Sequence, residues 1–237
     1  MTSATAQEIE VRSRFDALEA RFKADVAAVD ARLLALRAHL GLRNGGRCRL
    51  LDLGCGKGRF SARLREQGAE VVGLDLSAAM LAEGRGGPRV RGSARRLPFP
   101  DRTFDGVFAV EVLQHVAPGG LGAVLDEACR VLVPGGRLVI VDRNALAIDP
   151  ARPWLPALAL KWIDERRGRW MYEAGGPAKE RWFWPGSLQR RLRRDLIGLR
   201  VESLITAEES GRWLFDRCPQ ARRLRVWSAS KPREERR

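Results

Sequence analysis

Apolar residues recur every three or four positions through the first forty residues of the chain. The stripe consists of Val11, Phe15, Leu18, Phe22, Val26, Val29, Leu33, Leu36 and Leu40. This spacing gives an α-helix one apolar face, and Gly41 is the type of residue that ends a helix. The pattern predicts one long N-terminal helix. It would pack on the domain, pair as a coiled coil, or act as a lid over a ligand pocket.

From residue 48 onward, short apolar runs alternate with helical segments. Strands are predicted at 48–53, 69–76, 88–94, 104–116 (a strand running into a loop), 135–144, 199–206 and 222–230. Helices are predicted at 58–68, 77–84, 120–132 and 187–196, and Ser77 is suited to cap the second of these. Strands that alternate with helices favour right-handed crossovers and a parallel sheet. We therefore predict an α/β, doubly wound, mostly parallel seven-stranded sheet.

A tryptophan-rich stretch at 148–185 interrupts this alternation. Trp154, Leu158 and Trp162 fall four positions apart, which would place them on one helical face. The stretch could form an aromatic wall over a pocket, lie at a membrane interface with its arginines on headgroups, or act as a packing cap. We divide the chain into a helical extension or lid at 1–44 and a main domain at 45–237, with 148–185 as a substrate cap.

The composition is that of a folded globular protein. Of 237 residues, 45% are hydrophobic and 30% are charged. The chain contains no run of eighteen apolar residues and begins with a polar segment, so we expect neither a membrane span nor a secretory signal, and we expect a cytoplasmic location. The four cysteines form no CxxC pair and there are only two histidines, which argues against a metal site or a disulfide framework.

The formal net charge is +14, and residues 161–237 hold 20 Lys and Arg against 11 Asp and Glu. Such an excess could steer the protein toward nucleic acid, anionic lipid or an acidic metabolite. It could equally be spread over a solvated surface, because basic and aromatic residues are not interleaved in a nucleic-acid motif. We therefore do not expect a nucleic-acid partner.

Three glycines, Gly54, Gly56 and Gly58, lie between the first strand and its helix. Glycine there would let a ligand lie against the main chain. Asp75 closes the second strand, where its carboxylate could bind both hydroxyls of a ribose. Arg59 occupies the third glycine position of a dinucleotide fingerprint, so a nucleoside fits better than a pyrophosphate. A tight turn followed by a capping aspartate is the structural alternative.

These segments carry a family resemblance. Residues 50–81 (LLDLGCGKGRFSARLREQGAEVVGLDLSAAML), 94–116 (ARRLPFPDRTFDGVFAVEVLQHV) and 127–142 (EACRVLVPGGRLVIVD) resemble successive motifs of the class I S-adenosylmethionine-dependent methyltransferases. The similarity is to the small-molecule enzymes near the ubiquinone and menaquinone methyltransferases. It implies a Rossmann-like methyltransferase fold, S-adenosyl-L-methionine as cofactor, S-adenosyl-L-homocysteine as product, and no metal.

The resemblance also assigns roles to matching residues. The methionine end of the cofactor would meet Asp52, Gly54, Cys55 and Gly56, and Gly58 would belong to the same cofactor-binding loop. Glu111 and Val112 would border the methionine portion and the transferred methyl group. Asp75 would bind the ribose, and Leu76 would pack on the adenine. Where the family has an Asp that contacts the adenine amino group, this chain has Ser93, followed by Ala94. Adenine recognition would then depend more on the backbone of Ala94 and on stacking.

Methyl transfer from a sulfonium is accelerated largely by alignment of the acceptor with the methyl group. A hydroxyl acceptor also needs a base, for which His115 is the first candidate and Tyr172 the second. His115 could instead only pack or cap its loop. Two other functions stay open at this point: an RNA methyltransferase that uses the basic C-terminal half, and a non-catalytic cofactor-binding or scaffold protein.

Overall fold

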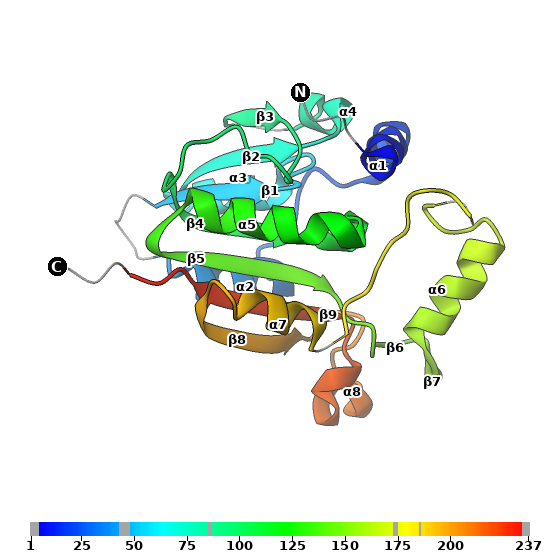
Figure 1. Ribbon diagram of the computed structural model, residues 1–237. Coiled ribbons are helices and arrows are strands. Elements are labelled where there is room, and N and C mark those ends of the chain that lie inside the picture. Colours follow the sequence, from blue (N-terminus) through cyan, green and yellow to red (C-terminus); the bar gives the residue numbers. More distant parts are fainter. Residues whose placement is uncertain (1–4, 43–47, 85–86, 173–174, 185, 234–237) are drawn as a thin grey trace.

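A computed structural model describes residues 5–42, 48–84, 87–172, 175–184 and 186–233. In the described chain seven strands form one sheet in the order β3-β2-β1-β4-β5-β9-β8 (Figure 1). They are β1 (Arg49–Leu53), β2 (Glu70–Asp75), β3 (Arg89–Arg91), β4 (Phe104–Val110), β5 (Leu132–Arg143), β8 (Ile197–Leu204) and β9 (Leu224–Ser230). β1 to β5 run parallel to one another, and β9 is antiparallel to both β5 and β8. The predicted α/β class and mostly parallel sheet are confirmed. The expected domain boundary at 44–45 lies outside the described residues.

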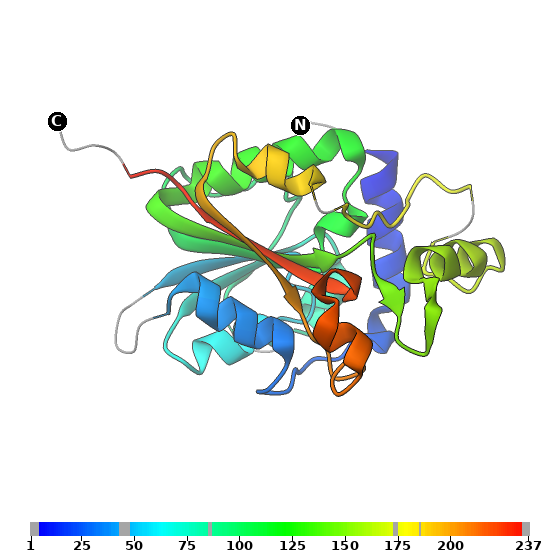
Figure 2. The same cartoon turned by 90° about the horizontal axis from the view of Figure 1, so that it is seen from below.

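Helices cover both faces of the sheet (Figure 2). One face carries α2 (Ala31–Leu40) and α3 (Arg59–Arg65), and the other carries α5 (Leu121–Val131) and α7 (Ser187–Leu192). The apolar run in β1 serves both faces, because successive side chains of a strand point to opposite sides. Leu50 packs with the α2 and α3 cluster, whereas Leu51 packs with the α5 and α7 cluster. A short α4 (Ala78–Ala82), capped by Ser77 as predicted, lies beside β2 and β3.

The prediction of one continuous N-terminal helix is wrong. α1 (Ala6–Ala17) ends before a 3₁₀ turn at Glu19–Arg21, and α2 begins only at Ala31. Asp30 starts the second helix, because its side chain accepts a hydrogen bond from the backbone nitrogen of Arg32 at 2.9 Å. Gly41 ends α2 in the left-handed conformation, as expected. The apolar stripe is thus divided between two helices that pack on different surfaces, which a helical period alone does not reveal.

α1 crosses the edge of the sheet at the carboxyl ends of the strands (Figures 1 and 2). A capping box begins the helix, with Thr5 and Glu8 bonded to each other's backbone nitrogens. In the same first turn Gln7 donates to the backbone oxygen of His115 at 2.9 Å. Asp16, near the other end, accepts hydrogen bonds from the Ser77 hydroxyl (2.5 Å) and from the backbone nitrogen two residues beyond it (3.2 Å). The helix is therefore tied to two separate loops of the sheet edge.

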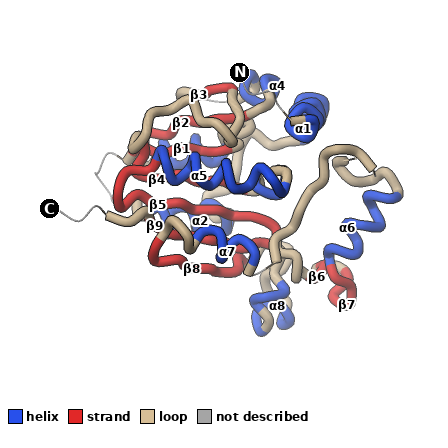
Figure 3. Tube along the Cα trace, in the orientation of Figure 1, coloured by secondary structure: helices blue, strands red, loops and turns tan. Residues whose placement is uncertain are grey.

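The tryptophan-rich stretch forms a small hairpin, β6 (Ile148–Asp149) with β7 (Arg152–Pro156), followed by α6 (Ala157–Arg166). Trp154 lies in β7 and is 76% exposed, so the expectation that it shares a helical face with Leu158 and Trp162 is wrong. The physical reason is Pro156, which cannot sit inside a helix and becomes the cap that precedes α6. Beyond α6 the loop runs back to the sheet (Figure 3). There Phe183 forms a bridge with Asn144.

The sequence pattern did not predict several short elements. They are α8 (Trp213–Arg217) and the 3₁₀ turns at Leu113–His115, Pro118–Gly120 and Pro219–Ala221. In the part of the chain that the structure describes, no helix combines the length and apolar character needed to cross a bilayer.

Candidate functional site

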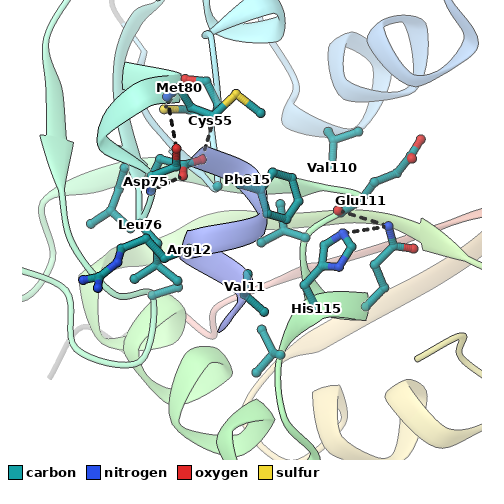
Figure 4. A pocket seen from close by; sticks show the side chains of 18 of the residues that line it. Val11, Arg12, Phe15, Cys55, Asp75, Leu76, Met80, Val110, Glu111 and His115 are labelled. Atoms are coloured by element: carbon teal, nitrogen blue, oxygen red, sulfur yellow. Dashed lines mark hydrogen bonds between the residues drawn. The ribbon is translucent and has the colours of Figure 1, made fainter. Parts of the chain in front are cut away.

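A cavity of about 300 Å³ lies at the carboxyl ends of β1, β2 and β4, with α1 forming one wall. In doubly wound sheets this edge is where ligands bind. Figure 4 shows the two ends of the cavity, with Asp75 and Leu76 at one end and Glu111 and His115 at the other. Phe15 of α1 lies between them. The site is therefore elongated and bounded by a segment distant in sequence.

The glycine loop opens one wall of this cavity. Gly54 and Gly56 both adopt left-handed backbone angles, with φ of 67° and 51°. A β-carbon on Gly54 would lie 2.5 Å from the side chain of Val112, whereas a β-carbon on Gly56 would meet no atom within 4 Å. Gly54 is thus required by packing against the loop after β4. Gly56 instead leaves bare main chain facing open space in the cavity.

Asp75 lies directly beside this bare main chain. Its Oδ2 accepts a hydrogen bond from the Gly56 nitrogen at 2.7 Å, and its Oδ1 accepts one from the Ser77 nitrogen at 2.8 Å. Burial raises the pKa of the carboxyl above its ordinary value, although the backbone donors oppose this. Each carboxylate oxygen has a further lone pair for a ligand hydroxyl.

Asp52 and Cys55 lie deeper in the same wall. Asp52 is 3% exposed and accepts a hydrogen bond from the Ser61 hydroxyl at 2.6 Å. Burial raises the pKa of Asp52 to about 7, and the neighbouring charge of Asp75 adds to the shift. Burial also raises the pKa of the Cys55 thiol, so this cysteine stays protonated and is not a nucleophile at neutral pH.

Glu111 follows β4 with a φ of 56°, an uncommon angle for a residue other than glycine. Its carboxylate receives Arg32 Nη1 at 2.8 Å and Arg143 Nη2 at 3.2 Å. Burial disfavours the charged form, but the two guanidinium groups outweigh it and lower the pKa below its ordinary value. Glu111 is therefore a paired anion that joins α2 and β5 at the floor of the cavity.

Arg59, the first residue of α3, also lines the cavity. Burial lowers the pKa of its guanidinium, with the nearby positive charge of Arg32 acting in the same direction. The guanidinium lies 4.9 Å from the centre of the Phe60 ring, and no carboxylate of the described residues forms an ion pair with it. Glu111, Asp30 and Asp52 attract this cation without contacting it directly. A partly buried cation that forms no direct ion pair among the described residues indicates where an anionic group of a ligand would bind.

The position where the family has an aspartate receives a carboxylate from elsewhere in the chain. The Ser93 hydroxyl donates to Oε1 of Glu8, on α1, at 2.5 Å, and Arg95 Nη1 lies 3.4 Å from Oε2. Glu8 and Ala94 line the cavity, whereas Ser93 does not. The serine thus holds the glutamate, and the glutamate faces the ligand space.

His115 is held on both ring nitrogens. Nδ1 lies 2.8 Å from the hydroxyl of Tyr172, and Nε2 lies 3.1 Å from the side-chain amide of Gln114. Burial lowers the pKa of His115 to about 4, so the ring is neutral at pH 7. Tyr172 is 2% exposed, and burial raises the pKa of its hydroxyl. Each of the two expected bases is thus engaged with the other.

The amide of Gln114 continues this chain of hydrogen bonds. With its oxygen toward His115 Nε2, its nitrogen donates to Glu180 Oε1 at 3.3 Å and to Asp142 Oδ1 at 3.2 Å. This orientation pairs every donor with an acceptor, and it makes His115 the tautomer protonated on Nε2. The tyrosine hydroxyl then donates to Nδ1. The network ends at two carboxyl groups, of which Glu180 lines the cavity.

Most of the site residues expected from the sequence meet around this cavity. The lining includes Asp52, Gly54, Cys55, Gly56, Asp75, Leu76, Ala94, Glu111, Val112 and His115. Gly58, Ser93 and Tyr172 do not line it. Trp154 and Trp162, expected in an aromatic wall, do not line it, and Trp170 takes that place.

Sequence reasoning missed Glu8, Arg59, Gln114 and Glu180 as lining residues. The first three carry usable signals: a Thr-x-x-Glu capping box, a cation at the start of the first crossover helix, and a polar neighbour of His115. Glu180 carries none, because only the folded loop brings it to the sheet edge.

Part of the chain is similar to known methyltransferases. The family model described as a methyltransferase domain matches residues 51–140. Demethylmenaquinone methyltransferase of Beutenbergia cavernae is 43% identical over 125 residues, which are 51% of this chain and 48% of that protein. The chain is thus similar to methyltransferases over part of its length. It spans about half the length of the curated relatives it matches.

Solved structures extend the likeness in fold to nearly the whole chain. Phosphoethanolamine N-methyltransferase 2 of Haemonchus contortus superposes with a TM-score of 0.68 at 17% identity, over 98% of this chain and 61% of that one. The [4+2]-cyclase SpnF gives a TM-score of 0.64 at 18% identity, over 98% of each chain. The fold is thus shared with proteins of different named activities, and function has to be argued from the site.

The matched segment does not include every residue around the cavity. The glycine loop, Asp75, Glu111 and His115 lie within the matched residues 51–140, whereas α1 and the loop with Trp170 and Glu180 lie outside. The matched segment therefore forms one part of the site. The other part lies outside it, in the N-terminal helix and in the loop between α6 and α7.

Proposed function

We propose that this protein transfers a methyl group from S-adenosylmethionine to a small-molecule acceptor. The observation that carries the proposal is the bare main chain at Gly56 beside the Asp75 carboxylate, within a cavity that Arg59 also lines. The similarity to a demethylmenaquinone methyltransferase supports it, as does a fold neighbour solved in complex with S-adenosyl-L-methionine.

The residues present fit this cofactor at both ends. Asp75 would accept hydrogen bonds from the ribose hydroxyls, and Leu76 would pack on the adenine. Glu8 would accept a hydrogen bond from the adenine amino group, the role that an aspartate has in the family. At the other end Arg59 would bind the methionine carboxylate. Asp52 would face the ammonium group.

When bound, the cofactor would supply a methyl group already activated by the positive charge of its sulfonium. The chain contributes position rather than strong acid or base chemistry. Val112 and the paired Glu111 border the end of the cavity beyond the glycine loop. His115 is neutral and has both nitrogens engaged, so we assign it the role of orienting Gln114 rather than that of a base.

The acceptor would be small and would bear an apolar or ring portion. Phe15, Phe22, Met171 and Trp170 line the cavity and supply the apolar surface for it. A cavity of about 300 Å³ with α1 as one wall favours a small acceptor over a nucleic-acid strand. The cytoplasmic location stays a prediction from the sequence.

The proposal is tested by incubating the protein with isotope-labelled S-adenosylmethionine and a fractionated cell extract. Mass spectrometry should find the label in a low-molecular-weight product, and calorimetry should show binding of S-adenosylhomocysteine. Label recovered only in RNA would favour the nucleic-acid alternative. Absence of cofactor binding would favour a scaffold and overturn the proposal.

Cofactor affinity should depend on pH through Asp52. Its folded-state pKa of about 7 lies above the ordinary value, so the carboxyl gains a proton as pH falls through 7 and no longer attracts an ammonium group. Binding of S-adenosylhomocysteine should weaken about tenfold between pH 7.5 and pH 6, since one pKa unit corresponds to a factor of ten. In Asp52→Asn, calorimetry should give a nearly flat profile. An equal slope in both proteins would refute the assignment.

Glu8 should select the adenine base. Glu8→Ala removes the carboxylate at the amino group, and loss of a hydrogen bond to a charged acceptor weakens binding roughly 10- to 100-fold. S-inosylhomocysteine has a carbonyl oxygen in place of the amino group, so the wild-type protein should reject it. The variant should bind both compounds with similar affinity, as measured by calorimetry.

Glu10→Ala is the matched control, because Glu10 lies on the same helix and pairs with Arg14 at 3.0 Å without lining the cavity. It should keep wild-type affinity and wild-type preference for adenine. If Glu8→Ala retained the full preference, adenine selection would reside elsewhere.

A further inference from the structure

Glu180 is a buried carboxylate that the cofactor scheme does not use. It is 9% exposed and lines the cavity at the end where Gln114, His115 and Arg143 also lie. Its Oε1 accepts the indole N–H of Trp182 at 2.7 Å, and its Oε2 accepts that of Trp170 at 3.0 Å. Two tryptophans from the same loop thus fix both of its oxygens in place.

No ion pair neutralises Glu180 among the described residues, although the chain is rich in arginine. Glu111, at the same end, has two guanidinium partners. Taking a carboxylate out of water without a cation is expensive, and indole and amide donors compensate for only part of that cost. A carboxylate has about four acceptor positions, of which Trp170, Trp182 and Gln114 take three.

The residues around Glu180 indicate which kind of group would take its fourth acceptor position. Trp170 and Met171 line the cavity next to Glu180, and Phe15 lines it from α1. Asp142, the other carboxyl on the Gln114 amide, is fully buried and does not line the cavity. Burial raises the pKa of Asp142 to about 8, and the negative charge of Glu111 adds to the shift. Asp142 is therefore largely protonated at pH 7. Glu180 is then the anionic end of the network that a ligand can reach.

We propose that Glu180 binds the methyl acceptor through an N–H or O–H donor held against the aromatic wall of Trp170 and Phe15. The acceptor class is therefore a ring-bearing amine or phenol. The hydrogen-bonded network of Tyr172, His115 and Gln114 positions Glu180. These three residues do not themselves contact the N–H or O–H group of the methyl acceptor. This inference rests on the proposed function, because it takes the remaining space of the cavity as the acceptor site.

The test uses the full chain saturated with S-adenosylhomocysteine and pairs of small probes. Phenethylamine is compared with ethylbenzene, and 4-ethylphenol with 4-ethylanisole, by ligand-observed NMR titration. The wild-type protein should bind at least one donor-bearing probe about tenfold more tightly than its twin, the size expected of a charge-assisted hydrogen bond. In Glu180→Gln that ratio should fall close to one, with affinity for S-adenosylhomocysteine unchanged.

Glu209→Gln provides the matched control. Glu209 is also buried, but it accepts backbone nitrogens of Thr206 and Arg223 outside the cavity. This variant should lose stability without altering the probe ratio. A preference for the amine alone or the phenol alone supports the inference and identifies the donor.

Two outcomes separate the hypotheses. If S-adenosylhomocysteine binds but the donor-bearing and masked probes bind equally, or if Glu180→Gln keeps the wild-type ratio, the role of Glu180 is overturned while the proposed function stands. If S-adenosylhomocysteine does not bind to the wild-type chain, the proposed function itself fails.

Discussion

Gly56→Val is expected to abolish detectable binding of S-adenosylhomocysteine. The new side chain would project into the open space beside Asp75, where the main chain now faces the cavity. No neighbouring atom lies within 4 Å of the added β-carbon, so the substitution fills ligand space rather than disrupting packing. Calorimetry should show a loss of affinity of at least about three orders of magnitude, since the ligand cannot move aside without losing its contacts to the loop.

Left-handed backbone angles complicate this experiment, because valine is strained at a φ of 51°. Gly68→Val is the control for this backbone strain. Gly68 has a φ of 88°, would place a β-carbon with no atom within 4 Å, and follows α3 outside the cavity. Both variants should lose comparable thermal stability, and only Gly56→Val should lose the ligand. Equal affinities in the two variants would show that the loop does not face the cofactor.

Asp75→Ala should produce the second largest effect. The carboxylate would bind two ribose hydroxyls, and each hydrogen bond to a charged group contributes about 1.5–3 kcal/mol. Loss of both weakens S-adenosylhomocysteine binding by roughly 10²- to 10⁴-fold. The bonds to Gly56 and Ser77 are lost as well, so the thermal midpoint should fall by a few degrees while the protein stays folded.

Asp105→Ala separates these two effects. Asp105 accepts the backbone nitrogen of Arg49 at 2.8 Å, at the opposite end of the sheet from the cavity. Its removal should lower stability without changing cofactor affinity. Unchanged affinity in Asp75→Ala would remove the ribose assignment, and with it the nucleoside interpretation of the whole site.

The sheet, and the part of the site that lies within residues 51–140, can be predicted from local sequence. Short apolar runs, glycines at the first crossover and Asp75 at the end of the second strand are all short-range signals. The carboxyl ends of neighbouring parallel strands meet at one edge, so Asp52, Asp75 and Glu111 converge once the fold class is known.

The remaining half of the site depends on contacts that no local pattern encodes. Glu8 meets Ser93 across 85 positions of sequence, and Tyr172 meets His115 across 57. The break between α1 and α2 was not predicted for a related reason. The periodicity of apolar residues indicates which residues are buried, but it does not indicate which surface they pack against. The tryptophans of β7 and α6, which stood out by composition, are mostly exposed, while Trp170 acquires its role only through its place beside the Glu180 carboxylate.

α1 holds Ser93 through Glu8, the His115 backbone through Gln7, and the start of α4 through Asp16. Because one helix makes all three attachments, moving it away from the cavity would require them to open together. Under the proposed function, residues 6–17 would then couple exchange of the methyl donor past this wall to two loops of the sheet edge.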